Sequence, residues 1–122
     1  MASTTGSLMT TGAVKKRFLT LCFGGNVRSV GLARALKEQH GQEAIAVGHG
    51  FVSPPTMNML CVWADYIMPM QDELKIYVPE QFRAKVRVID VGPDRYHVPT
   101  HPDLHQFFSR ITREWAEANW NI

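Results

Sequence analysis

The sequence predicts an α/β fold in which a four-stranded parallel sheet carries helices on both faces. Short apolar segments, rich in β-branched and aromatic residues, alternate along the chain with segments of helical periodicity. Alternation of this kind needs crossover connections, and crossovers join parallel strands. The chain has 122 residues, which is enough for one domain with a core of its own.

Residues 1–14 are polar and small and are expected to form a flexible N-terminal arm, followed by a single domain over residues 15–122. Strands are expected at residues 16–23, 43–47, 65–70 and 85–91. Helical segments are expected at residues 29–39, 54–63, 71–84 (with an interruption at Pro79) and 100–120.

Capping residues support the predicted helix ends. Gly41 follows the first helix as a C-terminal breaker, and Ser53 precedes two prolines as the N-cap of the second. Thr100 and Asp103 have the spacing of a capping box at the last helix. That helix also has the clearest apolar stripe, formed by Leu104, Phe107, Phe108, Ile111 and Trp115.

The composition excludes several functions. Thirteen Lys and Arg against eleven Asp and Glu give a net charge of +2, which is too small to predict a nucleic-acid partner. No apolar run approaches the roughly 20 residues of a membrane span, and the N-terminus lacks the apolar segment of a secretory signal. Cys22 and Cys61 fit a reducing cytoplasm, and neither they nor the histidines have the spacing of a metal site. We expect no cofactor.

Cys22 ends the first predicted strand, and Arg28 opens the first predicted helix after five intervening residues. A loop of this length, with glycines that permit close approach, can turn its backbone N–H groups inward around an anion. The loop residues expected to hold a phosphate are Phe23, Gly24, Gly25, Asn26, Val27, Arg28 and Ser29.

Each group in this loop has a proposed task. The Arg28 guanidinium can bind two phosphate oxygens at once, and the positive field of loop and helix favours a thiolate at Cys22. Ser29 can donate a hydrogen bond to the sulfur, and Asn26 can pin the loop. The alternative is purely structural: Cys22 packs in the core, the two glycines form a turn, and Arg28 is an ordinary surface charge. The position between a strand and a helix favours the functional interpretation.

The segment "LCFGGNVRSVGLARAL" resembles the phosphate-binding loop of the low-molecular-weight protein tyrosine phosphatases, whose pattern is V-C-x-G-N-x-C-R-S-P. "WADYIMPM" and "VRVIDVGPDRYHVPTHPDLHQFF" resemble later segments of short bacterial and phage-type members, so that the resemblance covers most of residues 16–112. It implies a three-layer sandwich with strand order 2-1-3-4. The chain departs from the pattern at Val27, which replaces a second loop cysteine, and at Val30, which replaces a proline.

The leaving oxygen of a phosphate ester needs a proton donor, usually a carboxylic acid. The family places an aspartate after the fourth strand, and Asp94 in "PDRY" resembles it best. Asp90 is the alternative general acid, although a carboxylate at a strand end often binds only backbone N–H groups. Asp103 is a weaker third candidate with a structural role at a helix start. Tyr96 can line the pocket mouth or pack the loop.

The predicted function is the hydrolysis of phosphate monoesters, with a phosphorylated protein or a small aryl phosphate as the substrate. The predicted catalytic residues are Cys22, Arg28 and Asp94. Phosphate or sulfate is expected to bind in the loop. One alternative is a thiol-dependent arsenate reductase, for which Cys61 on a packed helix is a poor second thiol. The other is a non-catalytic module that binds phosphate or a phosphoprotein. Phe23 and Phe51 are candidate hydrophobic walls of the site.

Overall fold

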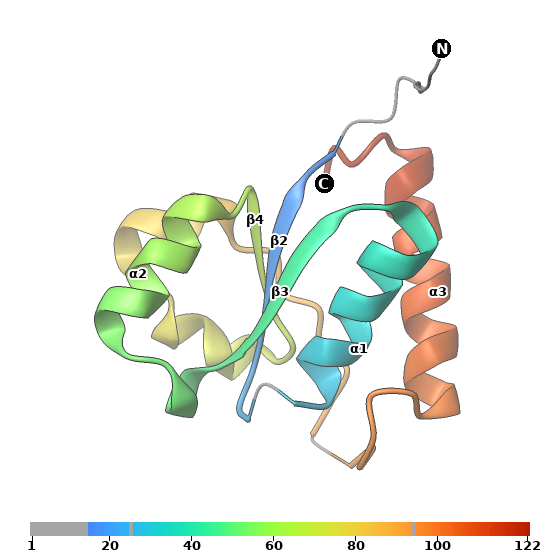
Figure 1. Cartoon of the computed structure of the whole chain (residues 1–122), viewed down its shortest axis with the longest axis horizontal. Coiled ribbons are helices and arrows are strands. Elements are labelled where there is room, and N and C mark those ends of the chain that lie inside the picture. Colours follow the sequence, from blue (N-terminus) through green and yellow to red (C-terminus); the bar gives the residue numbers. More distant parts are fainter. Residues whose placement is uncertain (1–14, 25, 94) are drawn as a thin grey trace.

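A parallel sheet of three strands in the order β3-β2-β4 forms the centre of the molecule (Figure 1). The computed structural model describes residues 15–24, 26–93 and 95–122. The strands are β2 (Arg17–Cys22), β3 (Glu43–Gly48) and β4 (Tyr66–Pro69). β2 pairs with both neighbours, so that the first three strands have the predicted order, with the first strand in the middle.

The segment 85–91, predicted to be a fourth strand, runs along β4 but forms one isolated parallel bridge, between Ile67 and Val86. Its N–H groups still donate to β4, as at Ile89, whose nitrogen lies 2.9 Å from the Pro69 oxygen. A regular ladder would need a return bond from the N–H of residue 69, which proline lacks. The prediction of a four-stranded sheet is therefore wrong, because the segment 85–91 lies beside β4 but lacks the regular pairing of a strand.

Helices cover both faces of the sheet, as predicted (Figure 1). On one side lie α1 (Arg28–Arg34), its π-helical continuation Ala35–Gln39 and α3 (Pro102–Glu117). On the other lie α2 (Pro54–Trp63) and the 3₁₀ helices Asp72–Tyr77 and Glu80–Lys85. The predicted helix at residues 71–84 is thus two 3₁₀ turns that Pro79 separates, because proline does not continue a helix.

Two of the three predicted caps are confirmed. Gly41 has a φ of +65° after the first helix, and the Ser53 hydroxyl accepts a hydrogen bond from Thr56 N. The cap of α3 is His101 and not Thr100, since Pro102 is the first helical residue and the cap precedes it. His101 Nδ1 accepts from the backbone nitrogen of Asp103 at 3.1 Å.

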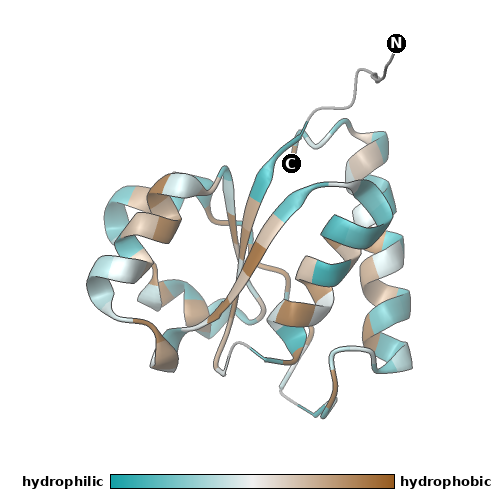
Figure 2. Cartoon of the chain, viewed as in Figure 1, coloured by the Kyte–Doolittle hydropathy of each residue, from teal (hydrophilic) through white to brown (hydrophobic). Residues whose placement is uncertain are grey.

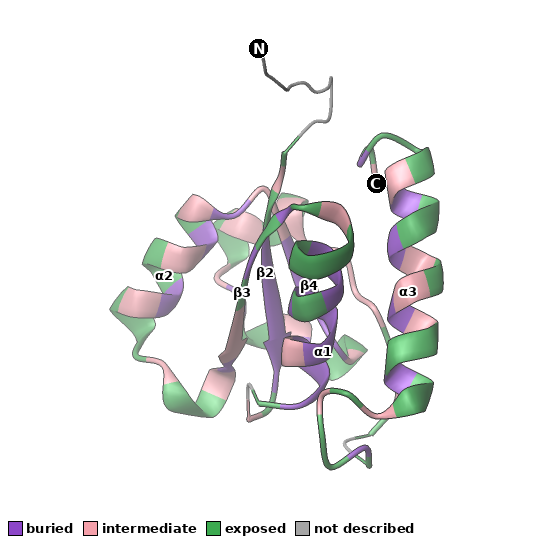
Figure 3. Cartoon of the chain, turned by 45° about the vertical axis from the view of Figure 1, so that its right-hand side comes forward, coloured by how far each residue is buried: buried purple, intermediate pink, exposed green. Residues whose placement is uncertain are grey.

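The core lies on both faces of the sheet, with β2 the most deeply buried strand (Figure 3). Phe18, Leu19 and Leu21 are fully buried, because a central strand has helices on each side. Hydrophobic residues accordingly line the strands in the middle of the molecule (Figure 2). On α3, Leu104 and Phe108 of the predicted stripe are buried against this core.

Gly31 marks the close approach of α1 to the segment before α3. A Cβ atom there would lie 3.1 Å from Pro99 O and 3.2 Å from Phe108 Cε2. We expect Gly31→Ala to lower the free energy of unfolding by about 1 kcal/mol or more, since overpacking outweighs the gain in helix propensity. Urea denaturation measures the change. Gly50→Ala is the matched control, because a Cβ at Gly50 meets no atom within 4 Å.

Candidate active site

Cys22 lies at the carboxyl end of the central strand, where ligands of parallel sheets bind. Its side chain is 2% exposed, and its Sγ lies 3.0 Å from the Oγ of Ser29 in the first turn of α1. The Thr20 hydroxyl donates to the Ser29 carbonyl at 2.8 Å, which ties the helix start to the strand. The predicted contact between Cys22 and Ser29 is present.

The backbone N–H groups of the loop from Cys22 to α1 are candidate donors to a bound anion. Among the described residues, the N–H groups of Phe23, Gly24, Asn26 and Val27 donate to no other described residue. No side chain caps α1, so its first N–H groups also lack an intrahelical partner. Gly25 lies outside the described residues. Unpaired N–H groups beside a thiol are the donors that a bound oxyanion requires.

Arg28 is 1% exposed, which is rare for an arginine, and it forms no ion pair with a carboxylate of the described residues. Its Nη1 donates to Gln71 Oε1 and, at 2.9 Å, to the carbonyl of Gly92. Its Nε is buried and has no hydrogen-bond partner among the described residues. The Nη1 edge of the guanidinium is therefore anchored, while the Nε–Nη2 edge has the geometry to grip an anion with two parallel bonds.

Gln71 and Gly92 are site residues that the sequence analysis missed. A usable signal existed, because Gln71 directly follows the third predicted strand and Gly92 directly follows the fourth predicted segment. The carboxyl ends of parallel elements meet at one edge of a sheet, so residues after them approach the loop at Cys22. Their contacts with Arg28 bridge 43 and 64 positions of the chain.

The candidate acids occupy different places. The exposed Asp90 accepts the N–H of Gly92 on its Oδ1 at 2.9 Å, which is the structural role that the sequence analysis gave as its alternative. Gly92 has a φ of +79°, a conformation that favours glycine in this tight turn. Asp103 is exposed in the first turn of α3. Asp94 lies outside the described residues.

Tyr96 packs the loop that follows residue 91. Its hydroxyl donates to the Val91 carbonyl at 2.9 Å, and its side chain is buried. The ring of His101 meets it edge-on at 5.3 Å. Of the two roles predicted for Tyr96, this geometry matches loop packing, because the hydroxyl ties residue 96 to the backbone of residue 91.

An aromatic cluster lies beside the loop. His49 stacks on Tyr77 with ring centroids 3.8 Å apart, and the Phe23 ring meets His49 edge-on at 4.7 Å. Phe23 stays 60% exposed, and Phe51 is 80% exposed. The sequence predicts Phe23 and Phe51 as hydrophobic walls but gives no sign of His49 and Tyr77, which the structure brings to Phe23. Phe23, which follows Cys22 in the chain, therefore packs against the ring of His49.

Cys61 is fully buried on α2. Burial raises the pKa of its thiol, and the charge of Lys85 acts in the opposite direction with the smaller effect. Cys61 is therefore a poor resolving thiol. Within the part of the chain that the structure describes, no three His, Cys, Asp or Glu side chains gather where they could hold a metal ion. None of its helices is both long and apolar enough to cross a membrane.

No protein-family model matches the chain, and no curated protein matches it. Several solved structures do. The tyrosine phosphatase AmsI of Erwinia amylovora is 16% identical with a TM-score of 0.63, and the match covers 92% of this chain and 98% of that one. Wzb of Vibrio vulnificus, solved with benzylphosphonate, is 16% identical with a TM-score of 0.65 over 86% and 99% of the two chains.

The arginine phosphatase YwlE of Geobacillus stearothermophilus is also similar, with 14% identity and a TM-score of 0.61 over 86% of this chain and 96% of that one. At identities this low, the similarity is one of fold. The parallel order of the strands and the helices on both faces agree with it. The chain therefore has the α/β fold of the low-molecular-weight protein tyrosine phosphatases.

Proposed function

We propose that the chain is a phosphate monoester hydrolase of the aryl class that works through a phosphocysteine intermediate. The observation that carries this proposal is the buried Arg28, anchored at Nη1 while its Nε has no partner among the described residues. An unpaired buried guanidinium nitrogen costs free energy unless a ligand completes it. A tetrahedral phosphate held against Arg28 and the loop N–H groups is such a ligand.

In the first step, Cys22 attacks the phosphorus atom as a thiolate, so that an S–P bond forms while the P–O bond to the aryl group breaks. The loop N–H groups and the Arg28 fork bind the three equatorial oxygens, on which charge accumulates. Asp94 donates its proton to the leaving oxygen. The choice of Asp94 rests on its sequence position, two residues after Gly92, whose carbonyl accepts a hydrogen bond from Arg28.

In the second step, water attacks the phosphocysteine, and the Asp94 carboxylate takes a proton from that water. An O–P bond forms, the S–P bond breaks, and Cys22 leaves as a thiolate. Ser29 Oγ lies 3.0 Å from Sγ, the distance from which its hydroxyl can stabilise that charge. The reaction needs reduced thiols, and this is the basis for proposing the cytoplasm as the place of the enzyme.

The exposed aromatic groups beside Cys22 support an aryl substrate. Phe23 follows the thiol in the chain and rests on His49, which stacks on Tyr77. A phenyl ring of phosphotyrosine can lie against this surface with its phosphate in the loop. YwlE is named an arginine phosphatase, so a peptide carrying phosphoarginine is the informative competing substrate. We expect the phosphotyrosine peptide to be hydrolysed faster.

The direct test is hydrolysis of p-nitrophenyl phosphate with excess EDTA present. Turnover in EDTA is the expected result, and vanadate should block it in a parallel assay without EDTA, because EDTA binds vanadate. Turnover of arsenate that depends on added thiol, without ester hydrolysis, would identify a reductase instead. Tight phosphate binding with no turnover of varied aryl phosphates would identify a binding module. The burial of Cys61 already argues against an internal thiol relay.

We expect Asp94→Asn to lower kcat for phenyl phosphate by about 10² to 10⁴, because the general acid is lost. The loss should be much smaller for p-nitrophenyl phosphate, whose leaving group departs readily without a proton. Asp90→Asn is the matched control, since the asparagine oxygen still accepts the Gly92 N–H. The opposite outcome, with the large loss at residue 90, would make Asp90 the acid.

A further inference from the structure

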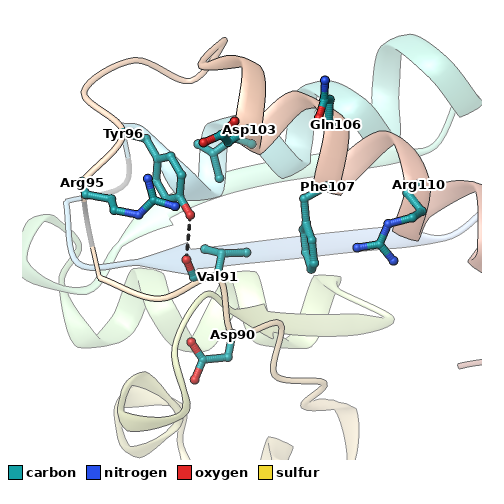
Figure 4. A pocket seen from close by; sticks show the side chains of 9 residues that line it. Asp90, Val91, Arg95, Tyr96, Asp103, Gln106, Phe107 and Arg110 are labelled. Atoms are coloured by element: carbon teal, nitrogen blue, oxygen red, sulfur yellow. Dashed lines mark hydrogen bonds between the residues drawn. The ribbon is translucent and has the colours of Figure 1, made fainter.

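The pockets of the chain differ in the chemistry of their linings. A large one, between residues 90–96 and helix α3, carries two arginines on opposite sides of its apolar surface together with Asp90 and Asp103 (Figure 4). Its opposed charges point to no single class of ligand. A smaller one lies between the segment after β3, helix α2 and the end of the 3₁₀ helix Asp72–Tyr77, and its lining is almost entirely apolar.

The smaller pocket suits one apolar group. Of the described residues that line it, none is an Asp, Glu, Lys or Arg. The lining residues are His49, Val52, Pro54, Met57, Tyr77 and Pro79. Its volume is about 220 Å³, below the roughly 300 to 1,000 Å³ of sites that take whole small molecules. The pocket therefore has room for a group about the size of one aliphatic side chain.

The register of the sheet places this pocket beside the proposed phosphate loop. Cys22 on β2 is paired with Gly48 on β3, so His49 follows at the same edge of the sheet as the loop. The ring of Phe23 meets His49 edge-on at 4.7 Å, and His49 stacks on Tyr77 with centroids 3.8 Å apart. His49 and Tyr77 both line the pocket. One aromatic surface therefore leads from the residue next to the thiol to the pocket.

The surface at this pocket is exposed as well as apolar. Tyr77 is 43% exposed, and Ile76, which precedes it in the chain, is 64% exposed. Phe51, which precedes Val52, is 80% exposed. Exposed apolar groups that gather at a pocket are typical of interaction sites, because a ligand that covers them removes their surface from water.

His49 is the polar exception among the lining residues. Its Nε2 is buried and has no hydrogen-bond partner among the described residues. Buried nitrogens in native proteins normally have a partner. In the tautomer that is protonated at Nε2, this group can donate to a backbone carbonyl of a bound peptide, whereas a lipid tail or a hydrocarbon offers no acceptor. The unpaired nitrogen therefore favours a peptide as the occupant.

We propose that this pocket is a specificity subsite that takes the aliphatic side chain of the residue next to phosphotyrosine in a protein substrate. The inference rests on the proposed function, since the phosphate occupies the loop and the tyrosine ring lies along Phe23. Adjacent Cα atoms of a peptide are about 3.8 Å apart, similar to the steps between the rings of Phe23, His49 and Tyr77. The neighbouring side chain can therefore reach the pocket while the phosphate is bound.

The test compares kcat/KM for a series of phosphotyrosine pentapeptides. The first contains alanine at all other positions, and two others carry leucine directly before or directly after the phosphotyrosine. One leucine peptide should be hydrolysed about fivefold to tenfold more efficiently than the alanine peptide, because its side chain leaves water. Asparagine, which has nearly the shape of leucine, should give no gain at that position. p-Nitrophenyl phosphate has no neighbouring residue and measures the chemistry alone.

Val52→Phe should fill the pocket and remove the preference for leucine over alanine. Val62→Phe, at an exposed position of α2 outside the pocket, is the matched control and should keep the preference. The preference is a ratio of two kcat/KM values within one variant, so a change in overall activity cancels. If Val52→Phe does not fold, Tyr77→Ala removes one wall and should lower the same ratio.

The outcomes separate this inference from the proposed function. Equal kcat/KM for the leucine and alanine peptides, together with turnover of p-nitrophenyl phosphate, would overturn the subsite and leave the phosphatase intact. A preference that persists in folded Val52→Phe or Tyr77→Ala would place the leucine elsewhere and would also overturn the subsite. A lack of turnover with every one of these esters would overturn the phosphatase, and the subsite with it.

Discussion

Cys22→Ser is expected to remove hydrolysis of p-nitrophenyl phosphate while the protein stays folded and still binds phosphate. A serine hydroxyl occupies nearly the same space as the thiol, which is 2% exposed at the end of β2, so the packing is retained. The hydroxyl is not ionised at neutral pH and is a much weaker nucleophile than a thiolate. We expect kcat to fall by about four orders of magnitude or more.

Three measurements make this result interpretable. Thermal unfolding shows that the variant folds, calorimetry with inorganic phosphate shows that the anion site remains, and steady-state kinetics gives the loss. Phosphate binding should persist because the Arg28 fork and the loop N–H groups are unchanged. Activity that survives the substitution would refute Cys22 as the nucleophile.

Cys61→Ser is the matched control for the other thiol. Cys61 is fully buried on α2, so its replacement by a polar hydroxyl should lower stability, and kcat at 25 °C should stay as in the wild type. A loss of turnover in folded Cys61→Ser would instead indicate a relay between two thiols. The pair of variants thus separates a phosphatase from a reductase with an internal second thiol.

The parts of the site that lie close together in the sequence were predictable. Cys22 ends a strand and Ser29 begins a helix after a short loop, so the chain itself brings them together, and the 3.0 Å contact follows from local geometry. Gln71 and Gly92 were missed since their contacts with Arg28 depend on how three elements end at one sheet edge. That is a property of the fold and not of any one segment.

The errors in the fold have a common origin. An apolar pattern predicted the strand at 85–91, but regular pairing depends on the partner strand, where Pro69 lacks the required N–H. The segment 71–84 was expected to be helical with an interruption at Pro79, and the interruption is present, but both parts are 3₁₀ helices and not α-helix. Patterns within a segment report which face is buried, whereas hydrogen bonding across segments decides the final structure.

Arg28→Lys is expected to lower kcat/KM by about 10² to 10⁴ although the positive charge is kept. The guanidinium performs two tasks at once, because Nη1 is held by Gln71 and Gly92 while the Nε edge is left for the substrate. A lysine ammonium is a single point and cannot hold two anchors and two phosphate oxygens in one plane. The loss should also appear as weaker inhibition by vanadate.

Arg34→Lys on the same helix is the control, since Arg34 is exposed and its ion-pair partner among the described residues is Glu38, at 3.5 Å. Its activity should match the wild type. Gln71→Ala offers a second variant in case Arg28→Lys folds poorly. It keeps the guanidinium but removes one anchor, and we expect a loss of roughly tenfold. Full activity in both folded variants would mean that an anchored fork plays no part in catalysis, and the proposed role of Arg28 would then be wrong.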